Sequence, residues 1–135
     1  MVVRTVVTVL CGVGLYASLF MLRKSIRAAR GEIRGSSVVK TARARLFFGV
    51  PNSLLGLLYY PAVALAVWLV HAPLAATVLL LVVFFAAATS VALGYSLLFV
   101  TRLACPYCWT SHAVNWVLLL LCTQLFVPDI LSRGI

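Results

Sequence analysis

Acidic and charged residues are scarce in this 135-residue chain. Only Glu32 and Asp129 are acidic, and charged residues make up 10% of the sequence, whereas 64% of the residues are hydrophobic. Ordinary soluble domains are about 45–50% apolar, so this composition excludes a soluble fold. The eleven Lys and Arg residues give a net charge of +9. In a soluble protein that charge would suggest nucleic-acid binding, but in so apolar a chain we interpret it as membrane topology and expect no nucleic-acid partner.

The sequence also lacks a polar stretch long enough for a separate water-soluble domain. Its four apolar runs lie at about 6–22, 53–70, 74–100 and 106–127. A helix needs about 17–25 apolar residues to cross a lipid bilayer, so each run is a candidate span. We therefore predict an all-α integral membrane four-helix bundle that forms one transmembrane domain over residues 1–135. No A-x-A cleavage site follows the first run, which favours a retained span over a signal peptide.

Prolines mark the boundaries of several runs. Pro51 precedes the second run, where a helix start tolerates its missing N–H. Pro73 follows a break after the second run, so the second and third spans are expected to form an antiparallel hairpin. Pro128 is expected to end the fourth helix. Residues 22–34 contain no proline, so the first helix is expected to continue past the bilayer into the basic loop 23–51.

Basic residues are unevenly divided between the two ends of the predicted bundle. Two crossings separate the loop 23–51 from residues 101–108, so both segments lie on the same side of the membrane. That side carries nine of the eleven Lys and Arg residues, and only Arg4 and Arg133 lie on the other. The positive-inside rule predicts a multi-pass cell-membrane protein with this face in the cytoplasm, or an endoplasmic reticulum protein if the organism is eukaryotic.

Two of the four cysteines form the motif Cys105-Pro106-Tyr107-Cys108, which begins the fourth run. At a helix N-terminus the unpaired N–H groups and the helix dipole favour a thiolate, which suits a reversible dithiol/disulfide pair. Covalent haem attachment needs His after the second cysteine, where Trp109 stands. Tetrahedral zinc needs two more ligands, and the sequence has no second CxxC or HxxxH motif, so we expect no metal. Cys11 and Cys122 lie singly in apolar runs and are assigned to packing.

Polar residues share one face of the predicted fourth helix. Cys105, Cys108, Ser111 or His112, and Asn115 recur at intervals of three and four residues. At membrane depth such side chains face the bundle interior or a cavity. For Ser111 and Asn115, hydrogen bonds to neighbouring helices explain the pattern as well as a ligand does. His112 lies one turn beyond Cys108, which favours a role as donor to a ligand carbonyl.

The segments CPYCWTSHAVNW and FFGVPNSLLGLLYY resemble the vitamin K epoxide reductase family, and the resemblance runs from about Cys11 to Leu121. It implies a bundle around a quinone of the menaquinone, ubiquinone or vitamin K type, which receives two electrons from the CxxC dithiol. It also implies that Cys108 is nearest the quinone and that Cys105 exchanges with a thioredoxin-like thiol protein in trans. Asn52 and His112 match the positions that hydrogen-bond the quinone carbonyls, the latter being tyrosine in vertebrate members.

Two departures from this family pattern shape the functional prediction. The loop lacks the family's two shuttle cysteines, and the position of the second falls near Ser36 or Ser37. Bacterial members also face the CxxC outwards, whereas the charge distribution predicts an inward face. We expect a membrane thiol:quinone oxidoreductase whose whole redox relay is Cys105 and Cys108, with reduction of a quinone epoxide as a variant. The alternative is a non-catalytic membrane scaffold or redox sensor derived from the same family.

Overall fold

The computed structural model describes residues 1–35, 37, 40 and 49–134, and the described chain is all-α. Its elements are α1 (Val2–Ala29), α2 (Asn52–Leu69), α3 (Pro73–Tyr95), the π-helical segment η3 (Ser96–Thr101) that continues α3, and α4 (Pro106–Arg133). α1, α2, α4 and the continuous helix 73–101 are each long and apolar enough to span a membrane. The predicted four-helix membrane fold, with the CxxC pair at the start of the fourth helix, is confirmed.

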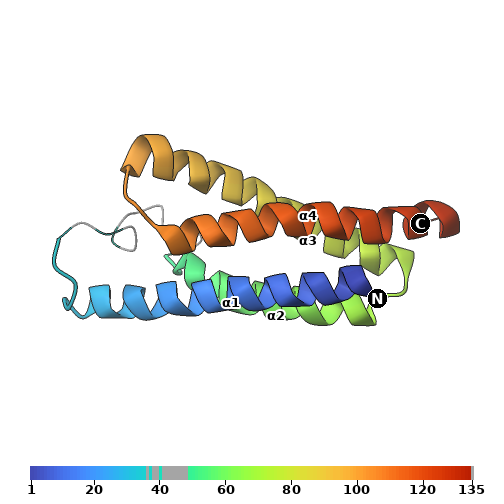
Figure 1. Cartoon of the computed structure of the whole chain (residues 1–135), viewed down its shortest axis with the longest axis horizontal. Coiled ribbons are helices and arrows are strands. Elements are labelled where there is room, and N and C mark those ends of the chain that lie inside the picture. The colour runs from blue at the N-terminus through green and yellow to red at the C-terminus, as the bar shows by residue number, and fades with distance from the viewer. Residues whose placement is uncertain (36, 38–39, 41–48, 135) are drawn as a thin grey trace.

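The four helices run alternately up and down, so that the chain crosses the bundle four times (Figure 1). The C-terminal end of α1, the start of α2 and the α3–α4 connection lie at one end of the bundle, while the start of α1, the end of α4 and the α2–α3 turn lie at the other. α1 packs against α2 and α4, and α3 packs against α4. Toward the CxxC end, α3 and η3 diverge from the other helices.

The C-terminal ends of α1 and α4 can be compared with the boundaries predicted from the sequence. α1 continues into the basic segment, as expected, and its C-cap residue Arg30 is followed by Gly31, which adopts a left-handed φ of 75°. The expectation that Pro128 ends the fourth helix is wrong, because α4 continues to Arg133. Pro128 removes one backbone donor, but the last turn is held by an ion pair between Arg133 and Asp129 at 3.0 Å.

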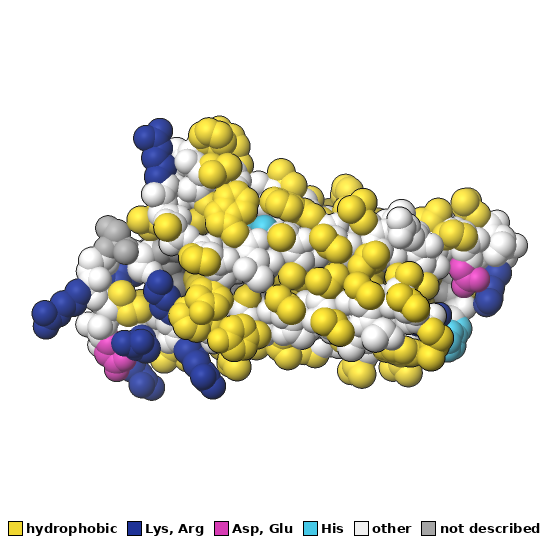
Figure 2. Space-filling view, in the orientation of Figure 1, with side chains coloured by type: hydrophobic (Ala, Val, Ile, Leu, Met, Phe, Trp, Pro, Cys, Tyr) yellow, Lys and Arg dark blue, Asp and Glu magenta, His cyan; other side chains and the backbone are white. Residues whose placement is uncertain are grey.

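The core consists mostly of small and branched apolar side chains, with two aromatic ones, and all four helices contribute to it. Cys11 and Cys122 are free thiols within this core and are almost completely buried, in keeping with the packing role predicted for them. The other buried members are Val7, Tyr60, Val63, Val67, Ala76, Leu79, Val83, Val114, Leu118 and Phe126. Larger apolar side chains cover much of the outer surface, as Figure 2 shows for one face. An apolar exterior suits contact with lipid tails.

Lys and Arg side chains gather at the CxxC end of the bundle in Figure 2. Among the described residues of that end, the basic ones are Arg23, Lys24, Arg27, Arg30, Arg34, Lys40 and Arg102. The acidic residue there is Glu32, which pairs with Arg27 at 3.3 Å. The structure therefore places the CxxC motif and the described part of the basic segment at one end, as the four-crossing topology predicts.

Small residues allow α1 and α2 to approach each other closely. A Cβ atom added at Gly14 would collide with the ring of Tyr60, and one added at Gly56 would collide with the hydroxyl of Ser18. Helices in lipid associate largely through such close packing, because lipid tails are as apolar as the helix surfaces. Gly14 therefore leaves room for the Tyr60 ring, and Gly56 leaves room for the Ser18 hydroxyl.

We expect Gly14→Ala to lower the free energy of unfolding by about 1–3 kcal/mol, because the added methyl group must displace the Tyr60 ring. Gly12→Ala is the matched control on the same helix, since an added Cβ there meets nothing within 4 Å. Thermal unfolding in detergent measures both variants. Equal stability of the two variants would show that the α1–α2 contact is not close packed.

Candidate functional site

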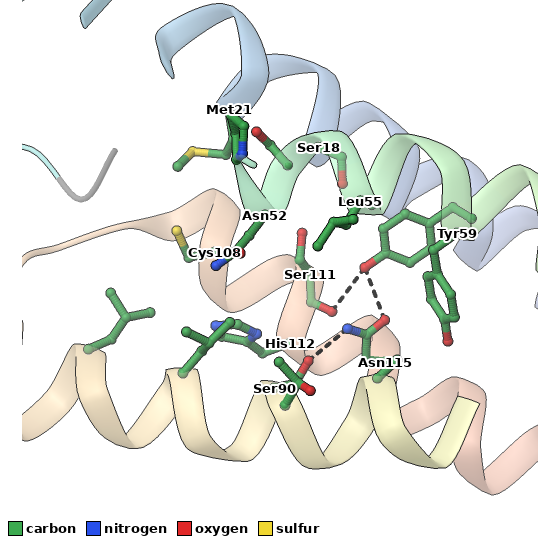
Figure 3. Close-up of a pocket in the computed structure, with 18 of the residues that line it drawn as sticks. Ser18, Met21, Asn52, Leu55, Tyr59, Ser90, Cys108, Ser111, His112 and Asn115 are labelled. Carbon is green, nitrogen blue, oxygen red and sulfur yellow. Dashed lines mark hydrogen bonds between the residues drawn. The ribbon is translucent and has the colours of Figure 1, made fainter. Parts of the chain in front are cut away.

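A cavity of about 350 Å³ lies between the helices at the CxxC end of the bundle. This volume is in the range of small-molecule sites, which are about 300–1,000 Å³. Five of the six predicted site residues line the cavity, namely Asn52, Cys108, Ser111, His112 and Asn115 (Figure 3). Cys105, the sixth, does not line it. The predicted polar face of α4 is therefore turned toward the cavity from Cys108 onward.

The CxxC motif forms the first turn of α4. Pro106 begins the helix, and Cys105 is the N-cap residue, whose sulfur accepts a hydrogen bond from the Cys108 N–H at 3.3 Å. The two cysteines are joined by a disulfide. Cys108 faces the cavity, whereas Cys105 is only 6% exposed and its Sγ lies 3.9 Å from the Met21 Sδ of α1. Cys105 thus lies against Met21, an α1 residue that also lines the cavity.

Tyr107, between the two cysteines, holds the motif against α1. Its ring stacks on Phe20 with the centroids 3.8 Å apart and the planes at 16°. Arg102, in the connection from η3, has a left-handed φ of 50°, a conformation that is uncommon for a residue with a side chain. The sequence pattern did not indicate Phe20 or Met21, because their contacts join segments more than 80 residues apart in the chain.

A chain of hydrogen bonds crosses the inner end of the cavity. The Tyr60 hydroxyl of α2 donates to Asn115 Oδ1 at 3.0 Å and lies 3.4 Å from the Ser111 carbonyl oxygen. Asn115 Nδ2 in turn donates to the Ser90 Oγ of α3 at 2.7 Å. Interhelical bonding, one of the two roles considered for Asn115, is therefore present. Tyr60 and Ser90 were not singled out from the sequence, since each lies in a largely apolar run without a helical pattern of polar residues.

His112 is the cavity residue with an unused ring nitrogen. It is 7% exposed, its Nδ1 is buried, and no hydrogen-bond partner for Nδ1 occurs among the described residues. Trp109 and Trp116 flank the ring, with centroids 6.1 and 6.4 Å from it. A buried polar group without a partner costs about 1–3 kcal/mol. In the tautomer that carries a proton on Nδ1, this nitrogen can donate to a ligand oxygen.

A sequence model of the vitamin K epoxide reductase family matches residues 5–123. The chain belongs to this family. The matched region contains the CxxC motif, Asn52 and most of the four helices, so the resemblance noted in the sequence is confirmed. A search of curated proteins found none that matches the chain. Membership of the vitamin K epoxide reductase family, together with the CxxC pair, supports a thiol-based redox role.

The cavity of this vitamin K epoxide reductase family member suits a quinone in its chemistry. A quinone has a flat apolar ring and two carbonyl oxygens that accept hydrogen bonds. Apolar side chains such as Leu55, Phe85 and Leu93 line the cavity, and His112 offers a buried nitrogen. Figure 3 shows Asn52 lying near Cys108 at the cavity wall. Within the described residues there is no group of three or more His, Cys, Asp or Glu side chains that could hold a metal ion.

The family's relay positions in the loop fall partly outside the described residues. Ser36 and residues 38–39 and 41–48 belong to this undescribed part, whereas Ser37 is described and is 8% exposed. The chain has cysteines only at positions 11, 105, 108 and 122. A second redox pair in this loop is therefore ruled out by the sequence itself.

Proposed function

We propose that this protein is a membrane thiol:quinone oxidoreductase that passes two electrons from a dithiol to a bound quinone through Cys105 and Cys108. The observation that carries the proposal is the position of Cys108 in one cavity with Asn52 and His112. Its family membership supports the same chemistry. Candidate substrates are quinones of the menaquinone, ubiquinone or vitamin K type, with a quinone epoxide as a variant.

The proposed reaction balances as a two-electron exchange. The two reduced thiols lose two electrons and two protons and form the Cys105–Cys108 disulfide. The quinone gains these two electrons and two protons and becomes a quinol. Asn52 and His112 donate hydrogen bonds to the two carbonyl oxygens, which become more negative as electrons arrive. The N-terminus of α4 favours the thiolate form of the cysteines.

Regeneration requires a dithiol that reduces the disulfide by exchange. In the proposal this donor is a thioredoxin-like protein acting in trans, and its thiolate attacks Cys105. Because Cys105 is buried and Met21 lies against its sulfur, the Met21 side chain must move during the exchange. Methionine has three rotatable side-chain bonds, which makes such a movement easy.

A non-catalytic scaffold or redox sensor is the second candidate function. The specific observation that favours it is the absence of cysteine from the loop 23–51, which removes the family's usual shuttle. In this candidate function the CxxC pair switches between dithiol and disulfide without transferring electrons to a quinone. Binding and reduction of a quinone decide between the two functions.

The redox relay is tested by cysteine variants. We expect Cys108→Ala to abolish quinone reduction by a small dithiol in nanodiscs, because no other cysteine lines the cavity among the described residues. The double variant Cys11→Ala and Cys122→Ala should retain reduction, since both thiols lie in the core. Loss of activity in a folded double variant would mean that a core cysteine is catalytic. A wild-type protein that neither binds nor reduces any quinone would establish the scaffold function.

The carbonyl donors are tested by His112→Ala and Asn52→Ala. Each should weaken quinone binding about two- to tenfold, because a hydrogen bond to an uncharged carbonyl contributes about 0.5–1.5 kcal/mol. Each should slow quinone reduction further, because the same bond strengthens as negative charge develops on the oxygen. Disulfide formation with a chemical oxidant should be unaffected. His112→Tyr should retain more function than His112→Ala, since a phenol still donates. Gln124→Ala is the control, because Gln124 is exposed and lies on α4 outside the cavity. Normal quinone binding by His112→Ala and Asn52→Ala would refute the assigned contacts.

The membrane orientation is a further part of the proposal, with the CxxC end in the cytoplasm of a cell-membrane or endoplasmic reticulum protein. Two exposed positions at opposite ends test it, through Arg34→Cys and Ser132→Cys. In sealed right-side-out cell-membrane vesicles, an impermeant thiol reagent should label the cysteine at position 132 and spare the one at position 34. The opposite pattern would reverse the orientation.

A further inference from the structure

Ser96, the first residue of η3, has a buried hydroxyl without a partner. It lines the cavity, is 2% exposed, and its Oγ has no hydrogen-bond partner among the described residues. Five helical threonines in the same chain donate their hydroxyls to the carbonyl four residues earlier, namely Thr5, Thr8, Thr77, Thr110 and Thr123. Ser96 lies where the helix changes from α to π geometry, and such changes often occur at functional sites.

Helix geometry places Ser96 near the level of Cys108 along the bundle. The hydrogen bond between Asn115 and Ser90 fixes a common level for α4 and α3. Ser96 follows Ser90 by six residues, which places it about 9 Å closer to the CxxC end at a rise of about 1.5 Å per residue. Cys108 lies seven residues back along the antiparallel α4, about 10 Å toward the same end. Ser96 and Cys108 therefore line the cavity at a similar level along the bundle, one from the α3 side and the other from α4.

A third donor at this level has a definite consequence for the substrate. The carbonyl oxygens of a quinone lie at opposite ends of its ring, and the proposed function assigns them to Asn52 on α2 and His112 on α4. If both carbonyl oxygens are bonded from α2 and α4, a donor on the α3 side of the cavity finds a partner on the ring only where a substituent carries an acceptor such as oxygen. A methyl group at that position would leave the Ser96 hydroxyl buried and unpaired, which disfavours such a ligand.

We propose that Ser96 is a specificity-determining residue that selects quinones bearing an oxygen substituent on the ring, of the alkoxy-benzoquinone class. This inference rests on the proposed function and narrows its substrate. A site built to donate a hydrogen bond discriminates strongly against a substrate that lacks the acceptor. Ser96 acts on selection alone, and the electron transfer is carried by Cys105 and Cys108.

The test compares two benzoquinones that differ in one feature. The first carries two methoxy groups, and the second carries methyl groups in their place. Binding to the oxidised protein, which cannot reduce them, is measured by quenching of tryptophan fluorescence, since Trp109 and Trp116 flank His112 at the cavity. Reduction of both quinones by the dithiol form is measured in parallel. We expect the methoxy-to-methyl preference to fall about fivefold in Ser96→Ala in both measurements.

The methoxy-to-methyl ratio of each variant is compared with that of the wild type. Intrinsic differences in reactivity between the two quinones enter both ratios equally and therefore cancel in this comparison. Thr77→Val is the control on α3. The Thr77 hydroxyl donates to the Pro73 carbonyl and does not line the cavity, so this variant should keep the wild-type ratio. If the ratio is unchanged in Ser96→Ala while the wild type still binds both quinones, the role of Ser96 is overturned and the proposed function stands. A stronger effect of Ser96→Ala on a quinone epoxide than on the methoxy quinone would overturn the alkoxy assignment. Absence of any quinone binding by the wild type would instead refute the proposed function.

Discussion

Hydrogen bonds between helices set the geometry on which the site depends. A lipid bilayer offers no water to satisfy buried polar side chains, so such groups must bond to one another or to a ligand. Asn115 bonds to Tyr60 and Ser90, which joins α2, α4 and α3 at one level. Beyond that level α3 diverges, and the cavity lies in the space between the helices (Figures 1 and 3).

The cavity and the CxxC motif are coupled through the first turn of α4. Stacking of Tyr107 on Phe20 and the contact of Met21 with Cys105 hold this turn against α1. Cys108 consequently faces the cavity, where His112 Nδ1 has no hydrogen-bond partner within the described part of the chain. Pre-positioning of reacting groups lowers a reaction barrier without further motion. Because Cys105 is buried and its sulfur lies against Met21, the proposed exchange with a partner thiol requires the Met21 side chain to move.

The sequence allowed the fold to be predicted because each span is a long apolar run with few charges. The face of α4 that lines the cavity followed from the spacing of Cys108, His112 and Asn115, since helical periodicity needs no knowledge of the neighbouring helices. Tyr60 and Ser96 could not be identified in that way. Their roles depend on how each helix is rotated and on where α3 changes its hydrogen-bond register, which are properties of the packed bundle.

The central claim, electron transfer between the CxxC pair and a quinone in the cavity, is tested most directly by a stoichiometric titration. Reduced protein in nanodiscs is mixed with a quinone in the absence of oxygen and of any other reductant. Quinol is measured by absorbance, and the Cys105–Cys108 disulfide by mass spectrometry of the blocked peptides. We predict one quinol and one disulfide per protein molecule. Quinone binding without quinol formation, or quinol formation with both thiols still reduced, would contradict the claim.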